Sequence, residues 1–160
     1  MFNTIAMQEL NKLVAFLEEK IPLMDKVNTT ISAATVGWHI QHSLLVINSI
    51  INGLKQSDPT TYQWKFNLSR TFIWTIGKIP RGKGKAPKVV QPQAEITKEL
   101  LLEHVEKAKS SVALLHSIQK NQYFLHPYFG HLNLKPTIKF LKIHTKHHLD
   151  IINDIAKAKA

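Results

Sequence analysis

Residues 136–157 read PTIKFLKIHTKHHLDIINDIAK, and this stretch decides how the chain is expected to fold. On a helical wheel of about 100° per residue, its apolar side chains gather on one side and most of its lysines on the other. The proline at its start suits the first turn of a helix. The pattern predicts an amphipathic helix over 136–157, with its apolar face buried against other helices.

Two histidines, His144 and His148, lie in the middle of that apolar face, four residues apart. Side chains at this spacing are neighbours on a helix, about 5–6 Å apart, and two such imidazoles can bind one metal ion. A buried imidazole without a partner costs roughly 1–3 kcal/mol for each unmade hydrogen bond. The pair is therefore either part of a metal site or two core histidines with separate partners, and this helix alone leaves both interpretations open.

Three other stretches place apolar residues at helical spacing: 4–20, 30–54 and 97–118. In the last of these, the apolar positions step by alternating four and three residues, which is typical of a helix-bundle seam. No long stretch alternates with period two, so no substantial strand is expected. The sequence therefore predicts an all-α fold: a four-helix bundle that forms a single domain over residues 1–160.

The connections between these helices predict their directions. A short turn between the first two helices predicts antiparallel neighbours, whereas about forty residues, 55–96, separate the second helix from the third. This long crossover lets the third helix run parallel to the second, and residues 63–76 within it have the spacing of an extra helix. Its proline- and glycine-containing part, 77–92, is expected to be ordered against the bundle near the histidines, as functional long loops commonly are.

The composition of the chain excludes several kinds of functional site and argues against several kinds of partner. The chain has no cysteine, which excludes disulfides, thiolate zinc sites and cysteine nucleophiles. No apolar run approaches the roughly 20 residues of a membrane span, and residues 1–3 lack the basic start of a secretory signal, so a soluble cytoplasmic protein without a membrane partner is expected. The formal net charge is +10, but only two of the 21 basic residues are arginines, which argues against nucleic acid as a partner.

A third metal ligand could come from residues 36–42, VGWHIQH. His39 and His42 both fall within the apolar arc of the predicted second helix, and periodicity alone does not choose between them. Three imidazoles with open coordination positions are typical of a catalytic metal site, whereas a structural zinc site is closed by four ligands. The other histidines away from the two motifs are more simply read as surface or capping residues: His104, His116, His126 and His131.

Four motifs in this order resemble the DinB-like metal-binding four-helix bundles, a superfamily whose relatives include bacillithiol-dependent S-transferases. Two are the histidine motifs, and two are similar to its DUF1569-like branch: GWHIQH (37–42), HTKHH (144–148), GKIPRGKGKAP (77–87) and HPYFGHL (126–132). The similarity covers most of the chain. It implies a bundle with a long crossover after the second helix.

The resemblance also implies a ligand set, namely one histidine from the second helix and two from the last. Carried over to this sequence, the ligands are His42, His144 and His148. The implied cofactor is a divalent metal, either zinc, nickel or iron, and three imidazoles do not discriminate among these ions. His39 and His147 are expected to lie beside the ligands and to donate to a metal-bound water or substrate.

Three functions remain open at this stage. A bound ion could make a nucleophile of a small-molecule thiol, which indicates a metal-dependent transferase. A metal-dependent hydrolase would normally use a carboxylate near the ion, for which Glu99 and Glu103 are candidates. The third is a non-enzymatic metal-binding or interaction bundle. Lys83 and Lys85 are expected to attract an anionic thiol substrate, with simple solubility as the alternative. A homodimer is also left open.

Overall fold

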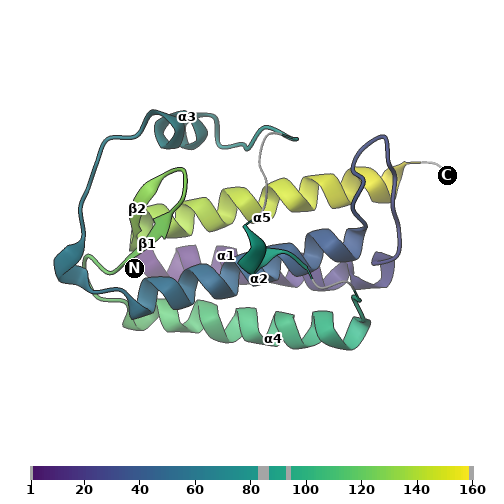
Figure 1. Ribbon diagram of the computed structural model, residues 1–160. Helices are drawn as coiled ribbons and strands as arrows, with labels where there is room; N and C mark the ends of the chain where they lie inside the picture. Colours follow the sequence, from purple (N-terminus) through teal and green to yellow (C-terminus); the bar gives the residue numbers. More distant parts are fainter. Residues whose placement is uncertain (1, 83–86, 93–94, 159–160) are drawn as a thin grey trace.

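The computed structural model describes residues 2–82, 87–92 and 95–158, which form four long helices, a short helix and a two-stranded hairpin (Figure 1). The helices and strands are α1 (Phe2–Glu19), α2 (Val36–Gln56), α3 (Leu68–Ile76), α4 (Lys98–Leu114), β1 (Tyr123–His126), β2 (Gly130–Asn133) and α5 (Leu134–Lys157). Short 3₁₀ turns are Ile21–Leu23, Pro59–Thr61, η3 (Lys88–Val90) and Leu115–Ser117. The mostly helical fold is as predicted, but the fold is not purely all-α, because β1 and β2 pair as a small antiparallel sheet.

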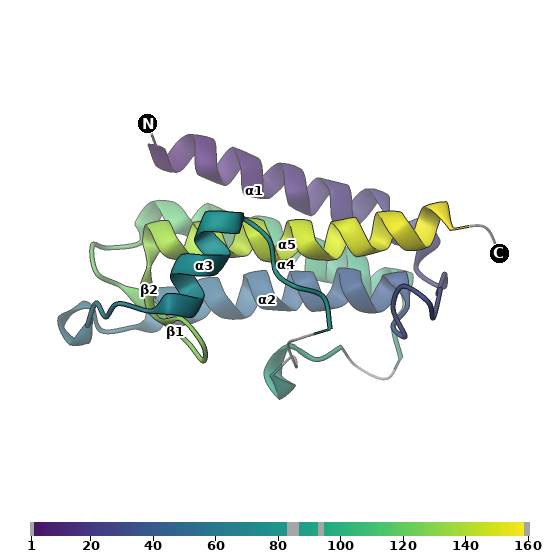
Figure 2. The same cartoon turned by 90° about the horizontal axis from the view of Figure 1, so that it is seen from above.

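The four long helices lie side by side, with α1 and α5 running one way and α2 and α4 the other (Figures 1 and 2). The long crossover does let α4 run parallel to α2, as predicted. Each of α1 and α2 packs mainly against α4 and α5, so α1 and α2 face each other diagonally and are not the expected neighbours. The reason is that α2 begins only at Val36, and residues 20–35 are long enough to cross the end of the bundle.

The core is formed by the apolar faces that the sequence pattern indicates. The bundle seam of α4 is buried, from Leu101 to Val112, and Leu115 follows it. Complete burial of a side chain of this size contributes about 1.5–3 kcal/mol. The largest completely buried side chains are Leu10, Leu17, Ile40, Leu44, Ile47, Ile51, Leu54, Leu101, Leu115, Leu132, Leu141 and Ile152.

Side chains at the helix starts explain where several helices begin. The Thr35 hydroxyl accepts from the Trp38 N–H, Asn67 accepts from Arg70, and Thr97 accepts from Leu100. Each bond satisfies a backbone donor that has no partner within its own helix. The expected helix over 63–76 is therefore shorter, since its cap is Asn67, and it ends at Gly77, whose φ of 64° favours glycine.

The hairpin before α5 was not predicted, because each strand has only four residues and neither shows a sustained alternation. Its register pairs Tyr123 with Asn133 and His126 with Gly130, whose φ is 70°. Phe124 packs on α2 at Gly53, where an added Cβ would lie 3.1 Å from the Phe124 ring. The missing side chain at this position therefore lets the hairpin approach α2 closely.

The short helix α3 lies over the hairpin and α5 (Figures 1 and 2). Ile73 is its buried side chain, and Trp74 packs edge-on against Phe129 at a ring-centroid distance of 5.2 Å. Leu68, Phe72 and Ile76 remain exposed on its outer side. A helix of nine residues is too short to be stable by itself, so α3 depends on its tertiary contacts through Ile73 and Trp74.

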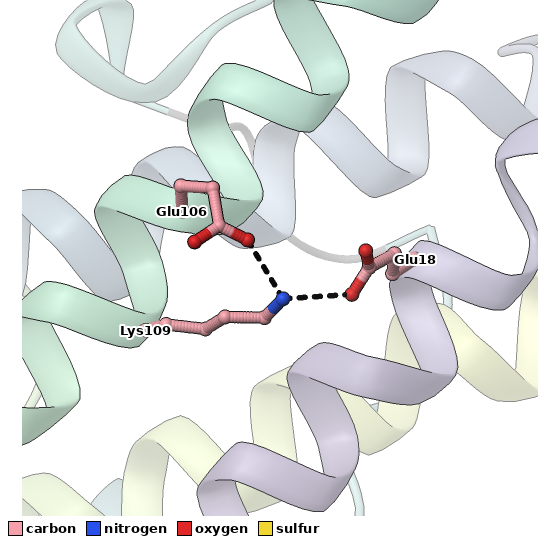
Figure 3. A network of polar contacts seen from close by, with 3 residues as sticks. All are labelled: Glu18, Glu106 and Lys109. Atoms are coloured by element: carbon pink, nitrogen blue, oxygen red, sulfur yellow. Dashed lines mark hydrogen bonds and ion pairs between the residues drawn. The ribbon is translucent and has the colours of Figure 1, made fainter.

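Ion pairs on the surface connect helices that the core already holds together. Lys109 on α4 lies 2.8 Å from Glu106 and 3.0 Å from Glu18 of α1 (Figure 3). These two carboxylates raise the pKa of Lys109. Exposed pairs of this kind contribute about 1 kcal/mol or less, so the bundle depends on its apolar core. Among the described residues, no helix combines the length and apolar character that a membrane crossing requires.

Candidate metal centre

Three histidines from two helices converge where α2 passes α5. One ring nitrogen from each of His42, His144 and His148 lies within 4.8 Å of the corresponding atoms of the other two. The Nε2 atoms of His42 and His144 are 3.3 Å apart. Two nitrogens bound to one tetrahedral ion at about 2.0–2.1 Å are separated by about 3.3–3.4 Å. The three histidines are therefore close enough to bind one metal ion.

His42 is oriented by a hydrogen bond from the crossover. Its Nδ1–H donates to the carbonyl oxygen of Val90, which is 2.7 Å away. Because a carbonyl can only accept, the proton of the neutral ring is on Nδ1 and the Nε2 lone pair is free for a metal. The His42 ring also stacks on Trp38, with a centroid distance of 5.0 Å and an interplanar angle of 17°. These contacts aim Nε2 at the other two histidines.

His148 is supported by a chain of polar side chains. Its Nδ1 lies 2.9 Å from Nδ1 of His39, and the His39 Nε2 lies 3.0 Å from the Ser32 hydroxyl. When His148 donates to His39 and His39 donates to Ser32, the Nε2 lone pair of His148 is left free for a metal. His39 therefore lies beside the ligands, as expected, but both of its ring nitrogens are used by His148 and Ser32 rather than by a metal-bound water or substrate, and the contact with Ser32 was not predicted.

His144 is the least satisfied of the three rings. Its Nδ1 is buried and has no hydrogen-bond partner among the described residues. Burial, followed by the nearby rings of His42 and His147, lowers the pKa of His144 well below its ordinary value of 6.5. Burial is also the main cause that lowers the pKa values of His42 and His148. All three rings are therefore neutral near pH 7, and this is the protonation state that a metal ligand requires.

The ligand atoms open on a cavity of about 490 Å³. Its wall is mostly apolar, and it combines side chains from α2, α3, the crossover, the hairpin and α5, among them Trp38, Ile50, Ile73, Ile79, Val90, Phe124, Phe129 and Phe140. The volume is typical of a small-molecule site. A metal ion held by three imidazoles beside this space would keep at least one coordination position for a ligand from the cavity.

The crossover supplies one side of the site. Ile79, Pro80 and Pro87 line the cavity, and buried Val90 in η3 holds His42. The prediction that residues 77–92 lie against the bundle near the histidines is confirmed for 77–82 and 87–92. The predicted steering residues Lys83 and Lys85 lie outside the described residues.

The carboxylates considered as bases are not at the site. Glu99 is exposed, and Glu103 forms an ion pair with Lys107 on the outer face of α4. Asp150 is also exposed, and Asp154 pairs with Arg81 at 2.7 Å. No aspartate or glutamate is among the described residues that line the cavity, and the residues outside the described ranges include none.

His147, the second predicted neighbour of the ligands, lines the cavity with its ring centroid 5.1 Å from that of His148. It contacts the backbone of Ile79 rather than a ligand ring nitrogen. Sequence reasoning missed Val90, because its contribution is a backbone carbonyl, and it missed His126, which lines the cavity from the hairpin.

Replacing His39 with leucine is expected to weaken zinc binding by about 10- to 100-fold, because His148 would lose the partner that fixes its ring orientation. Competition with a chromogenic chelator measures the dissociation constant. His116→Leu is the matched control, since His116 is exposed on the turn after α4. Equal affinities of the two variants would contradict the orienting role of His39.

No protein-family model, curated protein or solved structure matches this chain, so the resemblance to DinB-like bundles stays a prediction.

Proposed function

We propose that this protein binds one divalent metal ion through His42, His144 and His148 and transfers a small-molecule thiol to an apolar electrophile. One observation carries the proposal: the three ligand nitrogens face a mostly apolar cavity that no described carboxylate lines. The resemblance to DinB-like bundles implies the same ligands and is consistent with this chemistry. Zinc, nickel and iron all suit imidazole ligands.

The absence of acidic side chains from the described cavity wall favours a thiol over water as the nucleophile. A bound divalent ion lowers the pKa of a coordinated thiol, so that the sulfur is anionic near neutral pH. Three neutral imidazoles leave the ion's full positive charge in the site, which favours an anionic ligand. Hydrolysis would normally use a carboxylate to activate water, and Glu99 and Glu103 do not line the cavity.

The residues of the chain then have distinct parts in the transfer. The histidine triad and its partners His39 and Val90 hold the ligand nitrogens in place. The apolar wall holds the electrophile and excludes water. In the reaction, the S–H bond of the thiol breaks and its proton goes to solvent. A sulfur lone pair forms the new C–S bond while the leaving group departs with its bonding pair.

The test uses protein purified without a nickel column, stripped with a chelator and reloaded separately with zinc, nickel or iron(II). Cysteine serves as the small thiol, and 1-chloro-2,4-dinitrobenzene serves as an apolar electrophile that releases chloride. We expect thiol-dependent turnover with at least one metal, and we expect turnover to fall to the uncatalysed rate in the stripped protein and in His42→Leu. His116→Leu should keep the full rate.

Two results would overturn the proposed transferase. The first is thiol transfer that is equally fast in loaded and stripped protein, because then the metal centre has no part in it. The second is metal-dependent hydrolysis of 4-nitrophenyl acetate without any thiol, together with no thiol transfer. That result would favour the hydrolase.

A further inference from the structure

His126 is a histidine on the cavity wall that does not belong to the ligand triad. It ends β1 and lines the cavity, although its sequence context indicates only a surface or capping residue. Its ring lies flat on Phe129, with a centroid distance of 4.3 Å and an interplanar angle of 12°. It also meets the edge of Phe140 at 4.6 Å, and Phe140 in turn lies 5.5 Å from His144. His126 and His144 thus flank the same aromatic ring, that of Phe140.

The hydrogen bonds of the hairpin fix the tautomer of His126. Its Nδ1 accepts from the backbone N–H groups of Tyr128 and Phe129, at 3.1 and 3.2 Å. A nitrogen that accepts these bonds carries no proton, so the proton of the neutral ring is on Nε2. Burial lowers the pKa of His126 to about 4, which keeps the ring neutral at physiological pH. In the described part of the chain, no group accepts a hydrogen bond from this Nε2–H.

We propose that the cavity takes an apolar, aromatic-sized molecule with an oxygen or nitrogen acceptor, and that the Nε2–H of His126 donates to this acceptor. The inference rests on the proposed function in that this molecule would be the electrophile of the thiol transfer. The hydrogen bond itself requires no metal, and it is therefore tested separately.

The cavity wall explains why such a donor selects its ligand. Most of the wall is apolar, so a purely hydrocarbon ligand would fill it but leave the His126 N–H buried without a partner. A buried donor left without a partner costs more free energy than a hydrogen bond that is made typically contributes. A ligand with an acceptor at the right place avoids this cost. Ser49 of α2 also lines the cavity, and its hydroxyl is one competing donor.

The experiment compares two probes of nearly equal shape, 2-acetylnaphthalene and 2-ethylnaphthalene, which differ in one carbonyl oxygen. Dissociation constants are measured on the full-length protein by tryptophan fluorescence, since Trp38 lies in the cavity wall. The chelator-stripped protein is used first, so that the ketone cannot bind a metal, and zinc-loaded protein is used second. Each dissociation constant is divided by the water solubility of its probe. On this scale, we expect the native protein to bind 2-acetylnaphthalene about five- to tenfold more tightly than 2-ethylnaphthalene.

His126→Asn is the informative variant, because asparagine can still accept from the hairpin backbone but lacks the donor at Nε2. It should bind both probes with nearly the same relative affinity, because 2-ethylnaphthalene no longer leaves the N–H of residue 126 buried without a partner. If asparagine disturbs the hairpin, affinity for both probes falls, and His126→Phe, which can keep the ring stack on Phe129, supplies the same comparison. His116→Asn is the matched control and should keep the native preference.

Three results would overturn the assignment: no ketone preference in the native protein, an unchanged preference in both His126 variants, or a preference lost in Ser49→Ala alone. Failure of the proposed transferase looks different. In that case the ketone preference persists in stripped and loaded protein, but no thiol is transferred.

Discussion

Replacing His144 with leucine is expected to abolish metal binding and, at the same time, to stabilise the metal-free protein. Loss of a direct ligand should weaken zinc binding by more than about 100-fold, because loss of a residue that merely orients a ligand already costs about 10- to 100-fold. The gain in stability follows from the His144 Nδ1, which is buried without a partner among the described residues. Leucine has a similar volume and no polar atom, so the free energy of unfolding should rise by roughly 1–3 kcal/mol.

Two measurements check this prediction on the same samples. Elemental analysis and chelator competition give metal content and affinity, and urea unfolding after chelation gives the free energy of unfolding. His116→Leu, at an exposed position, should change neither quantity by much. A His144→Leu variant that is less stable than the metal-free native protein would show that His144 contributes to the fold, and retained zinc affinity would remove it from the ligand set. A substitution that weakens metal binding but stabilises the metal-free protein is expected at a residue that serves function rather than stability.

The metal-free protein is also expected to lose much of its stability between about pH 6.5 and pH 4. Burial lowers the pKa values of both His39 and His126 from 6.5 to about 4. Below pH 6.5 the unfolded chain binds a proton at each of these positions, whereas the folded protein does not until about pH 4. Stability therefore falls as the pH falls through this window, by at most about 3 kcal/mol for each ring. His144 and His148, whose pKa values lie well below 6.5, act in the same direction.

Urea unfolding of stripped protein at about pH 7.5 and about pH 4.5 tests this expectation. The midpoint should be clearly lower at the acid pH. Paired carboxylates act in a separate window: the pKa of Glu9 is lowered by Lys142, so its contribution is lost only below the ordinary carboxyl value of 4.5. Zinc at 100 times its dissociation constant should add about 2.7 kcal/mol at neutral pH. Equal midpoints at the two pH values would show that the buried histidines do not govern acid stability.

Much of the helical architecture could be predicted from local patterns. The seam of α4 and the apolar face of α5 follow from side-chain spacing, because burial of one face of a helix imposes a period of about 3.6 residues. The same spacing indicated that His144 and His148 share a face of α5. The long connection after α2 indicated that α4 can run parallel to it. These features depend on residues that are close in sequence or on the length of a connection. A single amino-acid sequence is therefore enough to predict them.

Other elements depended on contacts between distant residues. The hairpin of β1 and β2 has strands of four residues each, too short for a clear alternation, and Phe124 packs on α2 only because position 53 is a glycine. Because α2 begins only at Val36, the connection from α1 is longer than expected. As a result, α1 and α2 face each other diagonally and are not neighbours. Periodicity does not contain this information, since the same helix pattern fits several packings.

The candidate site divides in the same way. From the residues alone, the sequence determined that two histidines of α5 lie together on a buried face and that α2 offers His39 or His42 beside them; the choice of His42 came from the family resemblance. Only the tertiary structure decided that His42 meets His144 at 3.3 Å while His39 contacts His148 from outside the triad. It also brought the Val90 carbonyl and His126 to the same cavity. The physical reason is that helical spacing sets which face a side chain occupies, whereas ring orientation and cavity shape are set by the residues that pack against that face.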